Sequence, residues 1–293
     1  MNLTSYLKER KSWVEAALTA SVRNESIPEA LRNAMIYSLE AGGKRLRPIL
    51  VIASAEAVGG NVDKVMHAAI AMEMIHTFSL IHDDLPAMDD DSLRRGKPTN
   101  HKVFGEAFAI LAGDALLAQA FYVLTNTSTN LNSTATIEVI RDIAKATGGC
   151  GMTGGQALDI EATGKKITES ELTKLHLCKT GALITASVTS GAKLCGADSS
   201  QVLAFSKYGD SIGLAFQITD DLLDIEGNES VIGKDIGSDE SKGKSTYPAI
   251  IGVEASRQRA KNLVNDAIQS LSSFDEKAEP LRLIAKYIIE RDR

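Results

Sequence analysis

Apolar residues recur at steps of three and four along most of the chain, as at Leu31, Met35 and Leu39. That spacing places side chains on one face of an α-helix, whereas the strict alternation of a half-buried strand is nowhere sustained. We therefore predict an all-α protein. The pattern favours helices over residues 29–41, 45–57, 62–84, 106–125, 133–147, 169–195, 199–226, 246–271 and 278–291.

No linker rich in Pro, Gly or Ser divides the 293 residues, so we expect one domain over residues 1–293. The polar stretch 126–133 is predicted to be a surface connection, and the glycines of 148–155 interrupt helical propensity. Residues 107–124 are apolar almost all round, which indicates a helix covered on every side. A central core helix and a subunit interface explain that composition equally well.

The net charge of −6, with a pI near 5.5, argues against a general nucleic-acid binder, because such proteins carry an excess of basic residues. Charged residues between Lys8 and Lys11 precede the first apolar run, so we expect neither a signal peptide nor a membrane span. The three cysteines fit neither zinc spacing nor a disulfide framework, and a cytoplasmic location suits them best. They are Cys150, Cys178 and Cys195.

Two aspartate clusters, within residues 83–89 and 220–224, lie in otherwise apolar helical sequence. Asp220 and Asp224 are spaced i, i+4, so both carboxylates lie on one face of a helix and repel each other. A hard divalent cation neutralises such oxygen ligands, and Mg²⁺ binds through one or two carboxylates while bridging to substrate phosphates. The clusters therefore indicate a polyphosphate held between them.

Pro86 lies inside the first cluster and cannot continue the helix. Asp83 and Asp89, six positions apart, would point to different faces of an unbroken helix. We expect the helix to end or bend around residues 85–86, which lets Asp89 turn back toward the same ion.

Basic residues gather in three stretches that could answer this negative charge: 42–48, 94–98 and 233–244. Arginine forks match phosphate oxygens two at a time. The last stretch is rich in glycine, as a mobile flap would be. Together with the aspartates, these residues indicate phosphate chemistry.

Motifs along essentially the whole chain resemble those of the trans-isoprenyl diphosphate synthases. Residues 82–91 followed by 93–96 resemble the first aspartate-rich motif of bacterial farnesyl diphosphate synthases, and residues 213–224 resemble the second. Residues 155–159 and 179–183 match two shorter motifs. The resemblance implies the single-domain isoprenoid synthase fold, a bundle of roughly ten or more helices around a central active-site cavity. It also implies a homodimer.

The activity implied by the resemblance is a head-to-tail condensation. An allylic diphosphate ionises, the double bond of isopentenyl diphosphate attacks the cation, and a proton is lost to the released diphosphate. The implied cofactor is Mg²⁺, three ions per site, with Mn²⁺ as a substitute. No side-chain base is then needed, so His101 and His176 are poor catalytic candidates.

The resemblance also assigns site residues. Its metal ligands are Asp83, Asp84, Asp89, Asp220 and Asp224. The residues that it assigns to binding of the allylic diphosphate are Arg94, Lys179, Lys234 and Lys244. Those that it assigns to binding of isopentenyl diphosphate are Gly43, Lys44, Arg47, His76 and Arg95. Thr180 and Gln217 would line the carbocation. We interpret Asp114 and Asp159 as buried, hydrogen-bonded carboxylates outside the site.

Product length depends on Phe78 and Ser79, which lie about 6 to 7.5 Å along the helix axis before Asp83. An aromatic ring at Phe78 would floor the tail pocket and stop growth at fifteen carbons, from dimethylallyl or geranyl diphosphate as primer. Geranylgeranyl synthases of the plant type share the Pro86-Ala87 insertion and are the nearest alternative. A class I terpene cyclase is disfavoured by the second aspartate cluster, and a silent partner subunit is disfavoured because it would tend to lose these charged residues.

Overall fold

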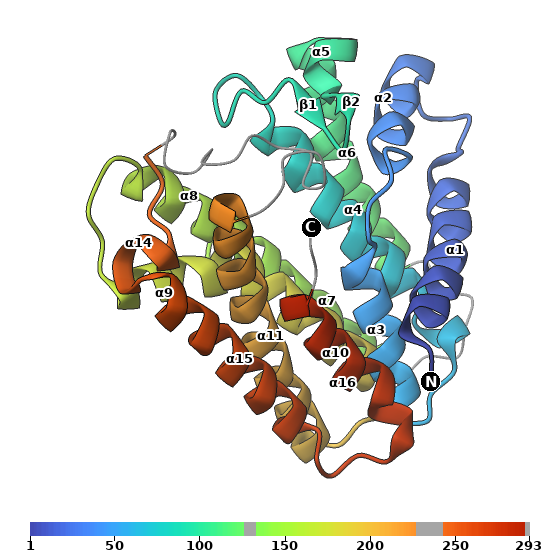
Figure 1. Cartoon of the computed structure of the whole chain (residues 1–293). Coiled ribbons are helices and arrows are strands. Elements are labelled where there is room, and N and C mark those ends of the chain that lie inside the picture. Colours follow the sequence, from blue (N-terminus) through green and yellow to red (C-terminus); the bar gives the residue numbers. More distant parts are fainter. Residues whose placement is uncertain (126–132, 227–242, 291–293) are drawn as a thin grey trace.

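The computed structural model describes residues 1–125, 133–226 and 243–290, and confirms the all-α prediction (Figure 1). Its only strands in that part of the chain form a short antiparallel hairpin, β1 (Leu93–Arg94) and β2 (Lys97–Pro98). The longer helices are α1 (Leu3–Val22), α2 (Glu29–Leu39), α3 (Leu46–Ala57), α4 (Met66–Asp83), α6 (Glu106–Thr125), α7 (Ser133–Thr147), α8 (Met152–Ala162), α9 (Glu169–His176), α10 (Ala182–Leu194), α11 (Ser199–Glu226), α15 (Val253–Ser270) and α16 (Glu279–Glu290). The short ones are η1 (Val62–Lys64), α5 (Asn100–Phe104), η2 (Leu177–Gly181), α14 (Tyr247–Ile251) and η3 (Glu276–Ala278).

Helix α3 lies between two hydrophobic clusters and is buried on nearly every side. Val51 and Ile52 belong to the cluster shared with α1, α4 and α6, whereas Ile49 and Leu50 belong to the cluster shared with α11, α15 and α16. Burial of an aliphatic side chain contributes about 1.5–3 kcal/mol, so a helix buried all round is firmly held. The basic loop that leads into α3 is therefore attached to a helix that both clusters hold in place.

Three helices of the described residues were not predicted: α1, α5 and α8. Helix α1 does carry a helical stripe of buried residues, Val14, Leu18 and Val22, among many polar ones. Gly252, with a φ of +87°, divides the predicted helix 246–271 into α14 and α15. Most of the predicted connection 126–133 lies outside the described residues, and Ser133 begins α7.

Helix α4 ends where the proline predicts. Asp83 is its last residue, and the chain then turns so that the Asp89 amide donates to the Asp83 carbonyl oxygen at 2.9 Å. Asp90 takes a φ of +49° in this turn. The bend therefore brings Asp89 back to the end of α4, as expected.

Helix α6 is long and apolar enough to span a membrane by length and composition, but it packs within the bundle against α2, α4 and α5. Only 33% of its most apolar window is buried, so the described part of the chain does not by itself cover this helix on every side, and a central core helix explains its composition less well than a subunit interface. The exposed apolar side chains include Phe108, Ile110, Leu111 and Tyr122.

Candidate active site

The first aspartate cluster is already paired with the β1–β2 hairpin. The Arg94 guanidinium donates to the Asp84 carboxylate, with Nε 2.9 Å from Oδ1, and also lies 3.1 Å from Asp91. Asp84 is only 3% exposed. Burial raises the pKa of Asp84, although the hydrogen bond from Arg94 opposes that rise. Arg94 thus neutralises Asp84 where Mg²⁺ was predicted to bind.

Asp83 lies in surroundings that disfavour its charge. Its pKa is raised to about 6, chiefly by burial and to a smaller extent by Asp89 and Asp84, against the opposing effect of Lys179 and Arg94. A raised pKa means that the surroundings penalise the carboxylate form. An added cation would remove that penalty.

The aspartates of the second cluster differ in how deeply they are buried. Asp221 is 2% exposed and accepts from the Tyr247 amide at 2.9 Å and from the Gln217 side chain at 3.2 Å. It is therefore a structural residue that fixes α14 to α11. Asp220 and Asp224 are half-buried one turn apart on α11.

Lys179 and Thr180 lie in η2, a π-helical turn between α9 and α10. Such turns are rare and often occur at functional sites. A Cβ at Gly213 would lie 2.7 Å from the Gly181 Cα, so the lack of a side chain lets α11 approach η2 closely. This approach lets Thr180 donate to the Gln217 side-chain oxygen at 3.1 Å.

Two further ion pairs join parts of the predicted site. Lys179 Nζ lies 2.5 Å from Asp159, which confirms Asp159 as a hydrogen-bonded carboxylate. Lys244 Nζ, just before α14, lies 3.7 Å from Asp89 Oδ1 at the end of α4. Asp114 differs from the prediction, because its side chain is 63% exposed on the surface of α6.

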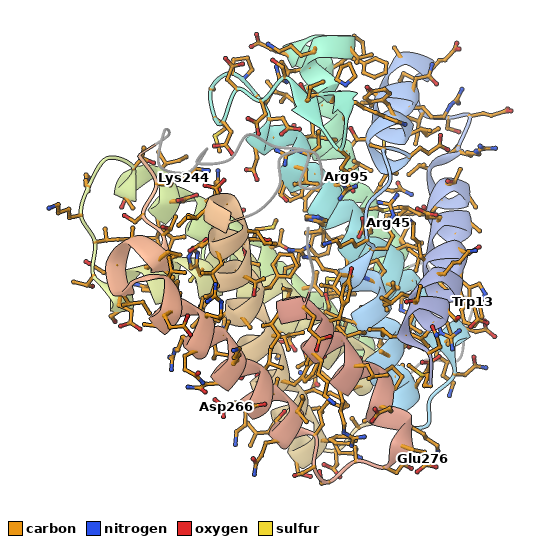
Figure 2. All side chains as sticks on the ribbon, in the orientation of Figure 1. Trp13, Arg45, Arg95, Lys244, Asp266 and Glu276 are labelled. Carbon is orange, nitrogen blue, oxygen red and sulfur yellow. The ribbon has the colours of Figure 1, made fainter. Side chains whose placement is uncertain are left out.

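Arg95 extends from the hairpin onto the loop before α3. Its guanidinium donates to the Gly42 carbonyl oxygen, and a Cβ at Gly43 would lie 2.5 Å from Cζ. Figure 2 shows Arg95 above Arg45 on this side of the bundle, with Lys244 on the other side. Position 43 must therefore be glycine for Arg95 to reach the loop.

Arg47 and His76 lie beside this loop, where positive charge accumulates. The pKa of Arg47 is lowered to about 10, chiefly by burial and to a smaller extent by Arg95, against the opposing effect of Glu73 and Asp220. Burial also lowers the pKa of His76 well below its ordinary value, and four neighbouring arginines add to this shift. His76 is therefore neutral at physiological pH, and the cluster is short of negative charge.

Residues 28–284 match the polyprenyl synthetase family. The chain is 45% identical, over 100% of its length and 99% of the relative's, to a farnesyl diphosphate synthase of Geobacillus stearothermophilus. It is 48% identical, over 99% of its length and 97% of the relative's, to a geranylgeranyl diphosphate synthase of Cyanophora paradoxa. The chain belongs to the polyprenyl synthetase family. The structure of a geranylgeranyl pyrophosphate synthetase from Pyrococcus horikoshii agrees, with a TM-score of 0.90, 31% identity and coverage of 99% and 98% of the two chains.

As a prenyltransferase of this family, the chain has donors that suit Mg²⁺. The side chains at the ends of α4 and on α11 supply carboxylate oxygens only, the ligands that this ion prefers. No group of three or more His, Cys, Asp or Glu side chains among the described residues is gathered tightly enough to hold a metal alone.

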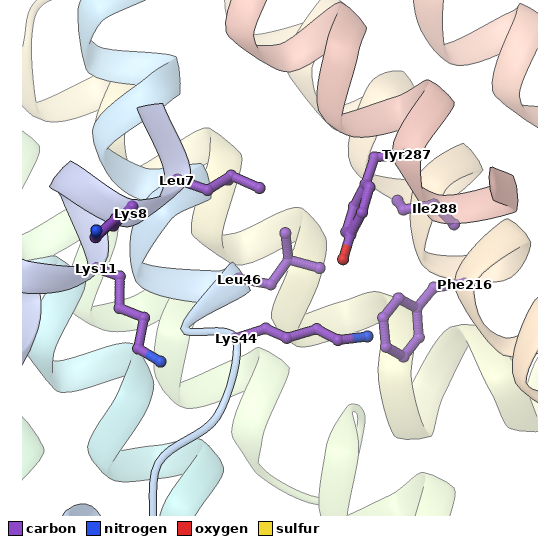
Figure 3. A pocket seen from close by; sticks show the side chains of 8 residues that line it. All are labelled: Leu7, Lys8, Lys11, Lys44, Leu46, Phe216, Tyr287 and Ile288. Atoms are coloured by element: carbon purple, nitrogen blue, oxygen red, sulfur yellow. The ribbon is translucent and has the colours of Figure 1, made fainter. Parts of the chain in front are cut away.

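A cavity of this prenyltransferase lies beside the basic loop, between α1, α11 and α16. It has a volume of about 230 Å³, and its lining includes none of the aspartates. Figure 3 shows the Lys44 side chain extending across it toward Phe216, below Tyr287. Lys44 therefore borders both this cavity and the predicted substrate site.

Lys234 and the rest of the predicted flap up to residue 242 lie outside the described residues, so its role stays a prediction. The sequence motifs assign no role to Glu73 and Asp221, both buried carboxylates that hold site elements in place. A lone acidic residue inside an apolar helix, as Glu73 is, was a usable signal for a buried ion pair.

Proposed function

We propose that the chain is a farnesyl diphosphate synthase, which condenses isopentenyl diphosphate head to tail with dimethylallyl or geranyl diphosphate and releases diphosphate. The proposal stands chiefly on the ion pair between Lys244 and Asp89. It joins the end of the basic stretch to the first aspartate cluster, as expected where a diphosphate bridges the two.

Asp83, Asp84 and Asp89 would hold Mg²⁺ on one side of the diphosphate, and Asp220 with Asp224 on the other. When bound, the metal stabilises the negative charge that develops on the departing diphosphate. Arg94, Lys179 and Lys244 contribute donors to the same oxygens, and Lys234 is proposed to do so from the flap. In the structure Arg94 and Lys179 are paired with Asp84 and Asp159, so binding requires them to exchange partners.

Isopentenyl diphosphate would bind without metal beside the loop before α3. Lys44, Arg47 and Arg95 supply its countercharge, neutral His76 supplies a hydrogen bond, and Gly43 leaves room for Arg95. Thr180 and Gln217 present oxygen dipoles to the carbocation. Their mutual hydrogen bond at 3.1 Å holds both side chains in place.

We propose a fifteen-carbon product because the Phe78 ring would limit the length of the tail pocket. Its ring is 9% exposed, belongs to the core, and lies about one turn before Asp83 on α4. Ser79, its neighbour, donates to the His76 carbonyl oxygen at 2.9 Å. Geranylgeranyl diphosphate is the alternative product, favoured by the 48% identity to a geranylgeranyl synthase.

The deciding experiment is incubation of the purified chain with Mg²⁺, labelled isopentenyl diphosphate and geranyl diphosphate, followed by dephosphorylation and chromatography. A fifteen-carbon alcohol supports the proposal, and a twenty-carbon alcohol supports the alternative. A cyclic hydrocarbon, or no turnover, would overturn both. Omitting Mg²⁺ is the matched control and should abolish turnover.

We also propose that the enzyme is a cytoplasmic homodimer. The exposed apolar face of α6 would be covered by a second copy, which removes it from water. Charge substitution at Leu111, whose side chain is 51% exposed, should yield monomers in sedimentation, whereas an unchanged mass would contradict the dimer. The three free cysteines agree with a reducing compartment.

A further inference from the structure

The imidazole of His82 lies between Phe78 and the neighbouring helix α6. Its ring meets the Phe78 ring edge to face, with centroids 5.4 Å apart and an angle of 89° between planes. On its other side, Nε2 lies 3.1 Å from the Ile110 carbonyl oxygen. Because a carbonyl oxygen only accepts, Nε2 carries the hydrogen of this bond. His82 is thus bonded to α6 on one side and supports the Phe78 ring on the other.

Gly113 leaves the space that the imidazole occupies. A Cβ at position 113 would lie within 3.0 Å of three ring atoms of His82, Nε2, Cδ2 and Cε1. Gly113 is not among the residues with positive φ, so its backbone conformation does not require glycine. Glycine inside a helix costs about 0.5–1 kcal/mol relative to alanine. The space for His82 is the structural reason for this glycine.

We propose that Gly113 and His82 are positioning residues that set product length through Phe78. This inference rests on the proposed function, in which Phe78 floors the tail pocket. His82 is one turn after Phe78 on α4 and its imidazole contacts the Phe78 ring between that ring and α6, so the ring cannot turn toward α6. Without that support the Phe78 ring moves away from the end of the tail pocket, and the prenyl tail grows longer.

The direction of the change follows from exposure. The His82 side chain is 27% exposed, whereas Phe78 is 9% exposed. A methyl group at position 113 therefore displaces the imidazole toward solvent, breaks its bond to Ile110, and removes its ring contact with Phe78. Asp114 does not replace that bond, because its Oδ1 lies 3.9 Å from Nε2, and it is exposed.

The test compares product ratios of wild type, Gly113→Ala and Phe78→Ala with geranyl diphosphate as primer. Gly113→Ala should raise the ratio of twenty- to fifteen-carbon product at least about threefold, with isopentenyl diphosphate consumption within about twofold of wild type. Added to Phe78→Ala, it should change the ratio no further, because both act on one ring. Gly149→Ala, where a Cβ meets nothing within 4 Å, is the matched control and should leave the ratio unchanged.

The outcomes separate the inference from the proposed function. If Phe78→Ala lengthens the product and Gly113→Ala does not, the positioning role is wrong and the floor stands. If Phe78→Ala leaves the product unchanged, the floor assignment itself fails. Should Gly113→Ala not fold, His82→Ala/Gly113→Ala removes the clash. That double variant must give the same lengthened products as His82→Ala, and wild-type products from both would overturn the inference.

Discussion

Arg45 and Glu73 form a buried ion pair, with Nη1 2.7 Å from Oε1 and side chains 2% and 1% exposed. Arg45 begins α3 with a φ of +52°, a conformation that non-glycine residues seldom adopt, and it also donates to the Leu39 carbonyl oxygen. The pair thus holds the end of the loop that carries Lys44 and the first turn of α3, which carries Arg47. Lys44 and Arg47 flank Arg45 closely in sequence, so the buried pair positions two proposed substrate contacts.

Glu73→Gln should therefore reduce the free energy of unfolding by about 3–5 kcal/mol, because it leaves a buried guanidinium without its charge partner. Urea unfolding measures the change. Glu15→Gln is a matched control: Glu15 also contacts Arg45, at 3.4 Å, but its side chain is 40% exposed, so its loss should cost under about 1 kcal/mol. Equal losses in the two variants would show that burial of the pair is unimportant.

The adjacent aspartates Asp220 and Asp221 should respond in opposite ways to substitution. Asp221→Ala leaves the buried Tyr247 amide without an acceptor and should lower stability by about 1–3 kcal/mol. Asp220→Asn should lower kcat by roughly 100-fold or more while changing stability by under about 0.5 kcal/mol, since it removes a proposed metal ligand only.

Thermal unfolding and steady-state kinetics of the same two preparations test this division. An Asp220→Asn variant with normal kcat would remove Asp220 from the metal site. An Asp221→Ala variant as stable as wild type would show that the bond to Tyr247 does not fix α14.

Local chemistry predicted some of these features and tertiary packing decided others. The bend after α4 follows from the missing N–H of Pro86, so the return of Asp89 could be predicted from the residues alone. The π-helical turn that carries Lys179 could not, because it depends on how closely α8 approaches: a Cβ at Gly155 would lie 2.5 Å from the Lys179 Cα. Arg45 and Glu73 are 28 positions apart, and no local pattern pairs them.

The same contrast between local sequence and tertiary packing holds for whole helices. Helix α1 was missed because its buried stripe is diluted by polar residues that only the bundle explains. The apolar composition of α6 indicated coverage, but only the structure shows which face the chain leaves open. The single domain over residues 1–293 stays a prediction.

His67 should make stability depend on pH between about 6.5 and about 4. Burial lowers its folded-state pKa to about 4, and its Nε2 has no hydrogen-bond partner. The unfolded chain binds the proton first, so this stabilisation is complete above the unfolded pKa of about 6.5 and is lost as pH falls toward 4.

We expect the loss to reach about 1–2 kcal/mol after allowance for partial solvent screening. The readout is the difference between wild type and His67→Gln in urea unfolding at pH 7, 5.5 and 4.5, because carboxylates titrate in both proteins. The difference should change with pH in that window. A constant difference would show that His67 keeps an ordinary pKa.

Lys244 should govern affinity for the allylic substrate in a salt-dependent way. Its pairing with Asp89 at 3.7 Å places an ammonium group at the first aspartate cluster, where each side chain is less than a quarter exposed. Lys244→Gln should raise KM for geranyl diphosphate about tenfold, since a charge-assisted bond to phosphate contributes roughly 1.5–3 kcal/mol.

Lys166→Gln, at an exposed lysine, is the matched control and should leave KM unchanged. Raising NaCl from 0.05 to 0.3 M, about a twofold shortening of the screening length, should raise wild-type KM more than that of Lys244→Gln. Parallel salt curves for the two proteins would mean that Lys244 contacts Asp89 without contributing to substrate binding.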